Sequence, residues 1–163
     1  MAERGKLDIR TDWLEPVTLR LTGKCEGYAL SRIRVRSHVV TIDEPPERGG
    51  TDLGPAPTET MVAALIGATN VILHRLARRD AATIDALDVA VDAVLDRRGV
   101  WLAEAIAVPW PEIRSRVRIA TPADDSRLAI WAEDLPRYSP LHATLRAAGT
   151  RLTEIWERTT IPT

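Results

Sequence analysis

The feature that most constrains this chain is a long uncharged segment near its middle. No charged residue occurs between Glu59 and Arg75, and residues 58–79 are rich in Ala, Leu, Ile, Val and Met. This composition predicts a helix that is buried on most sides, with a length of about 33 Å at ~1.5 Å per residue. One chain of 163 residues would struggle to cover such a helix, so we expect it to pack against a second copy of the chain.

Alternation of apolar and polar residues predicts strands on both sides of this helix. Residues 31–42 are expected to form one strand with a basic face, in a hairpin with residues 17–22. Cys25 would then lie near the hairpin turn. Residues 84–95 and 113–119 are expected to pair with each other, because aspartates on the first segment can face arginines on the second.

The remaining segments predict a loop, two helices and a final strand. Residues 43–57 carry four prolines and three glycines, which indicates a connecting loop. A helix is expected over residues 122–135 and to end at Pro136, and a second, shorter helix is expected to begin at Ser139-Pro140. With a last strand over residues 151–158, this order indicates an α+β fold, and the length indicates one domain over residues 1–163.

Composition excludes several functional classes. Lys+Arg 22 against Asp+Glu 23 leaves no basic field for nucleic acid, so no nucleic-acid partner is expected. With one cysteine and three histidines the chain has no Cys/His zinc pattern, and no metal or cofactor is predicted. The charged N-terminus lacks the apolar core of a signal peptide, and no uncharged run reaches the length of a membrane span. We therefore expect a cytoplasmic protein with no membrane partner.

The stretch from His38 to Ala68 resembles the OsmC family of thiol-dependent peroxidases and their relatives. The resemblance is carried by DEP at 43–45, GG at 49–50, Gly54-Pro55, Glu59 and AALIGAT at 63–69, with a second match at Ser139-Pro140-Leu141. It implies an intertwined homodimer, with antiparallel sheets packed around a long central helix from each subunit.

The resemblance also implies that the family's redox centre is missing. The family uses one cysteine in the long helix and one before the later short helix, and the matching positions here hold Ala68 and Ser139. A peroxidase of this kind needs one thiolate to attack the peroxide and a second thiol to resolve the sulfenic acid. An alanine methyl and a serine hydroxyl supply neither.

We therefore predict a small-molecule site between the subunits that works by non-redox chemistry. Its ligand would be apolar or carry a carboxylate. The candidate catalytic residues are Glu59, Ser139 and His38, and the candidate ligand-binding residues are Arg36, Thr58, Met61, Leu65, Ala68, Asn70 and Trp101.

Each of these candidates also has a purely structural interpretation. Glu59 follows the predicted helix start, where a carboxylate stabilises the first turn, and Ser139 before a proline is a typical N-cap. On the helical wheel, Glu59, Asn70 and His74 share one stripe, whereas Ala68 falls on the other side with Met61, Leu65 and Ile72. The basic strand face formed by Arg32, Arg34, Arg36 and His38 can be solvated, and Trp101 can serve ordinary packing.

Three alternatives to this prediction follow from the sequence. A Ser139/His142 nucleophile is one, and we set it aside because no third group is evident. A hydroperoxide reductase that uses Cys25 is the second. A non-catalytic, structural dimer is the third.

Overall fold

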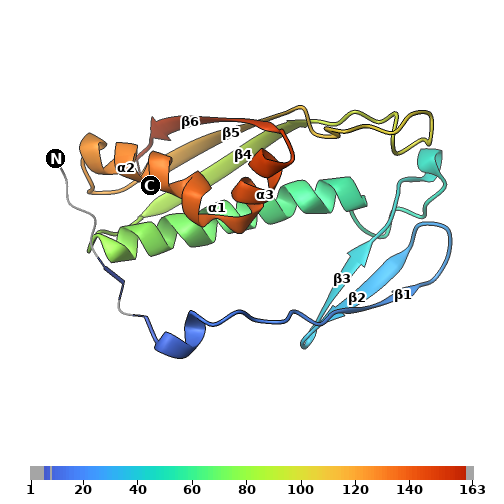
Figure 1. Ribbon diagram of the computed structural model, residues 1–163, viewed down its shortest axis with the longest axis horizontal. Helices are drawn as coiled ribbons and strands as arrows, with labels where there is room; N and C mark the ends of the chain where they lie inside the picture. The colour runs from blue at the N-terminus through green and yellow to red at the C-terminus, as the bar shows by residue number, and fades with distance from the viewer. Residues whose placement is uncertain (1–5, 8, 161–163) are drawn as a thin grey trace. The chain divides into compact units, whose positions relative to one another are not determined.

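The computed structural model describes residues 6–7 and 9–160, and its elements confirm the α+β class (Figure 1). The chain divides into two compact units, one formed by residues 8–64 and the other by residues 65–163 together with residues 1–7. The long helix α1 (Pro57–Arg79) begins in the first unit and ends in the second. The prediction of a single domain stays a prediction.

The second unit contains a three-stranded sheet in the order β4-β5-β6, with β4 at Ala86–Val94, β5 at Glu112–Ala120 and β6 at Arg151–Arg158. β4 and β5 are antiparallel, and Asp88 lies opposite Arg118, as the charge pattern predicts. β5 and β6 are parallel, which corrects the expectation of purely antiparallel sheets. The cause is the connection, because two helices separate these strands and return the chain to the same end of the sheet.

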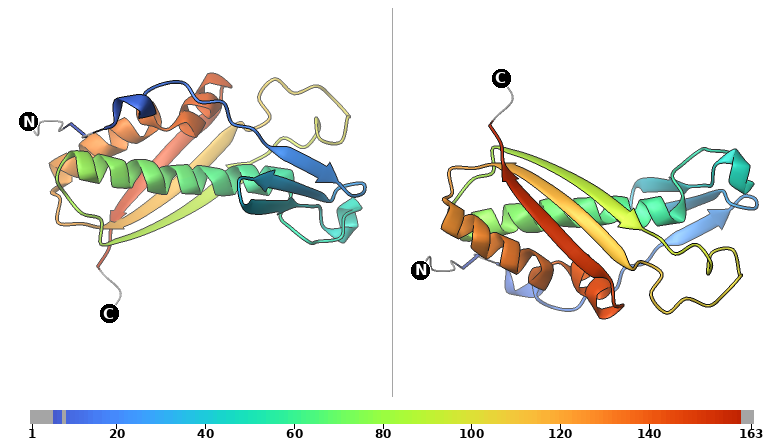
Figure 2. Two further views of the ribbon diagram at one scale, coloured as in Figure 1. Left: turned by 90° about the horizontal axis from the view of Figure 1, so that it is seen from below. Right: turned by 90° about the horizontal axis from the view of Figure 1, so that it is seen from above.

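One face of this sheet packs against helices and forms the core. The buried positions of β5 alternate along the strand, and the core cluster joins them to α1 and to α2 (Asp125–Tyr138). In Figure 2 the sheet lies behind the second-unit part of α1 in the left view and in front of it in the right view. The buried members of the cluster are Ile72, Leu73, Leu76, Ala77, Val117, Ile119, Leu128, Trp131 and Leu135.

Helix α2 extends past the residue that was expected to end it. Pro136 lies inside α2, and the helix continues to Tyr138. Proline removes one backbone donor, here the N–H that would bond the Ala132 carbonyl, and this loss is small so close to the end of a helix. The next turn is still closed, because the Ser139 N–H donates to the Leu135 carbonyl at 3.0 Å. Helix α3 (Pro140–Ala147) follows at once.

The first unit contains a second antiparallel sheet, in the order β1-β2-β3. Its strands are β1 (Thr22–Cys25), β2 (Ser31–Val35) and β3 (His38–Ile42). Residues 31–42 are thus two strands, which corrects the prediction of one. The chain reverses at Arg36, whose φ of 56° is in the left-handed region, and Val35 pairs with His38 across this turn. Arg-Ser is not a typical hairpin turn, so the sequence carried no signal for it.

The position of the first strand also differs from the prediction. β1 covers Thr22–Cys25 rather than residues 17–22. Cys25 is the last residue of β1 and pairs with Ser31, so it lies next to the β1–β2 turn, as predicted. The loop before α1 agrees with its proline and glycine content. Buried Asp43 organises it by accepting hydrogen bonds from the Thr51 hydroxyl at 2.6 Å and from the Thr51 and Leu53 N–H groups at 3.1 Å. The Thr51 hydrogen bond, with these backbone donors, lowers the pKa of Asp43 to about 2.

Helix α1 is long and apolar enough to cross a membrane by length and composition, with a mean hydropathy of 1.4 over its most apolar window. The core helix of a folded domain has the same properties. The described structure buries Leu65, Thr69, Ile72, Leu73, Leu76 and Ala77 of α1 within the chain. The absence of a membrane partner therefore remains a prediction, as does the cytoplasmic location.

Candidate functional site

Three polar side chains meet in the interior of the second unit, and we call them the Ser139–His142–Glu154 array. Ser139 Oγ lies 2.7 Å from His142 Nδ1, and His142 Nε2 lies 3.8 Å from Glu154 Oε1. Ser139 is 0% exposed and His142 is 1% exposed. Glu154 Oε2 accepts a hydrogen bond from Trp156 Nε1 at 3.2 Å, whereas Glu154 Oε1 is buried and has no hydrogen-bond partner.

Local sequence explains why these groups converge. Leu152, Glu154 and Trp156 alternate along β6, so all three lie on the face of the sheet that turns toward the helices. Glu154 is opposite the buried Ser115 of β5. Ser139 and His142 stand three residues apart at the start of α3, so both belong to one helical turn.

Burial decides the protonation of the array. It lowers the pKa of His142 to about 4, and the positive charge of Arg146 acts in the same direction. Burial raises the pKa of Glu154, against the opposing effects of the Trp156 hydrogen bond and of Arg146. At neutral pH, His142 is therefore a neutral imidazole that offers one donor and one acceptor between a hydroxyl and a carboxyl group. Ser139 and the His142 ring share a hydrogen bond, whereas the 3.8 Å between His142 Nε2 and Glu154 Oε1 is too long for one.

Two expectations about Ser139 are corrected by this geometry. Ser139 occupies the N-cap position of α3, but its side chain makes no capping hydrogen bond to the backbone, because its hydroxyl is engaged by the His142 ring. The expectation that no third group accompanies Ser139 and His142 is also wrong, since Glu154 supplies one. Ser139 is nevertheless fully buried, so its hydroxyl is not presented to a substrate as a nucleophile.

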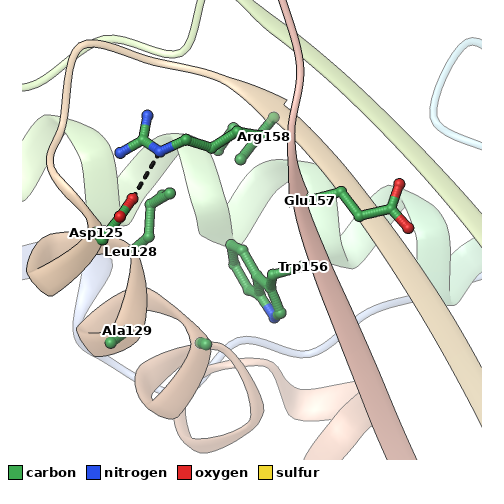
Figure 3. Close-up of a pocket in the computed structure, with 8 residues that line it drawn as sticks. Asp125, Leu128, Ala129, Trp156, Glu157 and Arg158 are labelled. Carbon is green, nitrogen blue, oxygen red and sulfur yellow. Dashed lines mark hydrogen bonds and ion pairs between the residues drawn. The ribbon is translucent and has the colours of Figure 1, made fainter.

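Glu154 also lines an open groove between α2, α3 and β6, with a volume of about 280 Å³. Its lining residues are Ala132, Glu133, Pro136, Arg146, Leu152, Glu154 and Trp156. A second hollow of about 280 Å³ lies further along β6 and shares Ala132 and Trp156 with the groove (Figure 3). There Arg158 Nε is 2.7 Å from Asp125 Oδ1, and the Arg158 guanidinium also donates to the Thr121 and Ala123 carbonyls. These contacts tie β6 to the start of α2.

A buried ion network joins the end of α1 to α2. Arg79 contacts Asp80 at 2.9 Å and Asp134 at 2.7 Å, and Asp80 also accepts a hydrogen bond from Trp131 Nε1 at 2.8 Å. Both carboxylates are almost fully buried. Hydrogen bonding to Asp80, together with Asp134, raises the pKa of Arg79. All these groups are engaged with one another, so we assign the network to packing rather than to ligand binding.

The predicted catalytic residues fall in different surroundings. Glu59 Oε2 accepts a hydrogen bond from the Ala56 N–H at 2.8 Å, which is the capping contact that its structural interpretation expects. His38 is exposed at the start of β3, and Ser139 is buried in the array. No described contact joins these three residues, and their catalytic roles stay predictions.

The exposure of the predicted ligand-binding residues of α1 agrees with the two faces predicted from the helical wheel. Leu65 is buried, while Met61 and Ala68 are half-buried on the same side. Asn70 is exposed with Glu59 and His74, and a His74 ring nitrogen lies 3.0 Å from the Asn70 carbonyl oxygen. The predicted division of the helix into two faces is therefore confirmed.

The other predicted ligand-binding residues lie in turns, at the helix start or in loops. Arg36 is in the β2–β3 turn and not on a strand face, and Thr58 is half-buried in the first turn of α1. Trp101 is 53% exposed in the β4–β5 loop, where the Arg97 guanidinium lies 5.7 Å from its ring centroid. Among the described residues, no group of three or more His, Cys, Asp or Glu side chains is arranged to hold a metal ion.

Comparison with known proteins gives a consistent result. The family model for OsmC-like protein matches residues 49–154. The fold is similar to that of an OsmC-like protein from Mycoplasma pneumoniae, with a TM-score of 0.74, 13% identity, and coverage of 90% of this chain and 100% of that chain. A search of curated proteins found no match.

Two further solved structures carry a description of activity in their names. One is the organic hydroperoxide resistance protein OsmC from Legionella pneumophila, with a TM-score of 0.63, 9% identity, and coverage of 88% of this chain and 98% of that chain. The other is the organic hydroperoxide resistance protein OhrB of Bacillus subtilis, with a TM-score of 0.56, 15% identity and the same coverage. At such low identity these similarities establish the fold alone.

Proposed function

The chain belongs to the OsmC family, and from that premise we propose that it is a homodimer that binds or transforms a small molecule by non-redox chemistry. The ligand would be apolar or carry a carboxylate, and it would occupy a cleft between the two subunits. The single observation that carries the proposal is the burial and hydrogen bonding of Ser139. This residue occupies the position where the resemblance expects a cysteine. Its hydroxyl is 0% exposed and hydrogen-bonded to His142, which suits a structural or proton-holding group.

This chain lacks the pair of thiol groups that reduction of a peroxide by a thiol pair requires. Organic hydroperoxide resistance is named for the Legionella and Bacillus proteins, and reduction of a peroxide by a thiol pair requires two sulfur atoms. The sequence has one cysteine, Cys25, which is exposed on β1 with its Sγ 3.7 Å from Ser31 Oγ. A sulfenic acid formed at Cys25 would have no second cysteine in its own chain to resolve it.

The exposed side of α1 supports the homodimer. Small or uncharged residues form this stripe, and they are Ala63, Ala64, Gly67, Asn70, Val71 and His74. An uncharged helical face that its own chain leaves uncovered suits packing against a second copy. Gly67 gives a sharp test, because a Cβ built there meets no atom of the chain within 4 Å.

The apolar character of the proposed cleft comes from the other edge of α1. Met61 and Ala68 are half-buried there beside buried Leu65, so a methyl group stands where a thiol would stand in the family's peroxidases. We propose Arg36 for the polar contact with the ligand, because Asn70 lies in the uncharged stripe on the opposite side of α1. This combination favours an apolar body with one carboxylate, because the arginine fork matches a carboxylate and the helix supplies the apolar surface.

The dimer is tested by light scattering at low micromolar concentration, on the parent and on Gly67→Leu. The parent should have about twice the 18.0 kDa monomer mass, and Gly67→Leu should be folded but monomeric. A parent that is a stable monomer would overturn the dimer and with it the cleft.

The ligand class is tested by a thermal-shift screen of carboxylates, aromatic compounds and hydroperoxides. Ala68→Met should weaken binding of a cleft ligand at least tenfold by filling the cleft, whereas Ala143→Met, on the exposed side of α3, should not. A hit that is equally strong in both variants would remove the cleft as its site, and a screen in which only hydroperoxides act would contradict non-redox chemistry.

A further inference from the structure

The groove between α2, α3 and β6 contains a largely buried carboxylate that forms no close ion pair with a Lys or Arg of the described residues. The Glu154 side chain is 13% exposed, and no Lys or Arg nitrogen of the described residues lies within 4.0 Å of it. Its nearest titratable neighbour, His142, is neutral at physiological pH because burial lowers its pKa to about 4. A buried carboxylate without a cation is unfavourable, and a positively charged ligand group would compensate it.

Ala132 also lines the groove, and the proline four residues later leaves its carbonyl without the usual helical donor. Pro136 has no N–H, so the Ala132 carbonyl does not receive the hydrogen bond that the helix would otherwise supply from position 136. Ala132, Pro136 and Glu154 are all lining residues. A carboxylate and a helix carbonyl are the acceptors that an ammonium group, with its three donors, requires.

The groove also offers a cation for a negatively charged group. Arg146, in the last turn of α3, is exposed and makes no ion pair or side-chain hydrogen bond with any described residue. It influences the electrostatics of the site, since its charge lowers the pKa of both His142 and Glu154. Between the charged groups, Leu152, Trp156 and Pro136 supply apolar walls.

We propose that this groove is a binding site for a small zwitterion with an apolar body, of the chemical class of the apolar amino acids. Its ammonium group contacts Glu154 and the Ala132 carbonyl, its carboxylate contacts Arg146, and its side chain packs on Trp156 and Leu152. A volume of about 280 Å³ accommodates a molecule of this size. His142 lies behind the Glu154 carboxyl, with its Nε2 3.8 Å from Glu154 Oε1, and the other nitrogen of the ring is 2.7 Å from Ser139 Oγ.

This site is separate from the inter-subunit cleft of the proposed function. It is built from α2, α3 and β6, whereas the cleft was assigned to α1 and to residues of the first unit. The two proposals can therefore fail independently. Ala68→Met should leave the groove intact, and a change at Glu154 should leave the cleft intact.

The probes are L-phenylalanine, phenethylamine, which lacks the carboxylate, and 3-phenylpropionate, which lacks the amine. Binding to the full-length protein is measured by saturation-transfer NMR and by titration of tryptophan fluorescence. L-phenylalanine should bind saturably, and each truncated probe should bind at least fivefold more weakly, because each loses one of two charge-assisted contacts.

Substitutions of the charged groove residues test which of them contact the probe. Glu154→Gln should weaken L-phenylalanine binding at least tenfold, and Arg146→Gln should weaken it at least threefold. The matched controls Glu157→Gln and Arg151→Gln, on the opposite face of β6, should change it less than twofold. Glu154→Gln should also raise the melting temperature of the free protein, because it removes a largely buried carboxylate that has no close ion pair.

The proposal is overturned by any of three results. One is the absence of saturable binding of L-phenylalanine up to the solubility limit of the probe. Another is equal binding of 3-phenylpropionate and L-phenylalanine, which would remove the ammonium site. The third is equal L-phenylalanine binding by the parent and by a folded Glu154→Gln variant.

Discussion

Titration of His142 should make the stability of this protein fall in mild acid. The imidazole is 1% exposed and close to Arg146, and burial lowers its pKa from 6.5 to about 4. Above pH 6.5 the ring is neutral in both the folded and the unfolded chain. Between pH 6.5 and pH 4, the unfolded chain binds a proton at this position and the folded chain does not, so the free energy of unfolding decreases as the pH falls.

The magnitude follows from the pKa difference. Each pH unit inside this window changes the free energy of unfolding by up to about 1.4 kcal/mol, so His142 should account for about 2 kcal/mol between pH 7 and pH 4.5. Glu154 acts in the opposite direction, because its raised pKa lets the folded chain bind a proton before the unfolded chain does. The contribution of His142 must therefore be isolated by comparison with a variant.

The assay is urea denaturation at fixed protein concentration from pH 7.5 to pH 4.5 on the parent, His142→Gln and His38→Gln. The stability difference between the parent and His142→Gln should change by about 2 kcal/mol over this range, in the direction that favours the variant in acid. His38, which is exposed, serves as the control for replacing a histidine by glutamine. A profile for His142→Gln that is parallel to that of the parent would refute the assignment of a buried neutral imidazole.

Three further substitutions test structural assignments by chemical denaturation. Arg79→Leu should cost about 3–5 kcal/mol, because it removes the cation closest to two buried carboxylates and leaves them only the longer contacts with Arg127 and Arg137, and a cost below 1 kcal/mol would contradict the buried ion network. Glu59→Gln should cost less than about 1 kcal/mol if capping is its only role, and any loss of ligand affinity in that variant would instead place Glu59 in the site. Gly50→Ala should cost several times more than Gly27→Ala, because a Cβ at Gly50 would lie 1.7 Å from the Glu44 carbonyl oxygen while one at Gly27 meets nothing within 4 Å.

Much of the fold could be predicted from the sequence because its signals are local. The helix α1 follows from its uncharged segment, and the pairing of β4 with β5 follows from aspartates that face arginines. The β2–β3 turn could not be predicted, because Arg36-Ser37 lacks the usual turn residues and the alternation continues through it. The parallel pairing of β5 with β6 also depends on a helical connection between them, which periodicity does not encode.

Only part of the Ser139–His142–Glu154 array could be predicted from the sequence. Ser139 and His142 are three residues apart on one helix, but Glu154 comes from a different element and joins them only through the packing of β6 against α3. A signal was nevertheless present, since Glu154 is an acidic residue at an inward position of an alternating strand, between Leu152 and Trp156. A charged residue at an inward strand position is a reason to search for a site.

The measurement that tests the central claim most directly is thiol-dependent turnover of organic hydroperoxides by the purified protein. The assay supplies a dithiol reductant and compares the parent with Cys25→Ser, which removes the one cysteine of the chain. The account predicts that both proteins match the background rate, because Ala68 has no thiol and the Ser139 hydroxyl stays protonated at neutral pH. Robust turnover by the parent that Cys25→Ser abolishes would contradict the account and establish a peroxidase whose thiol is Cys25.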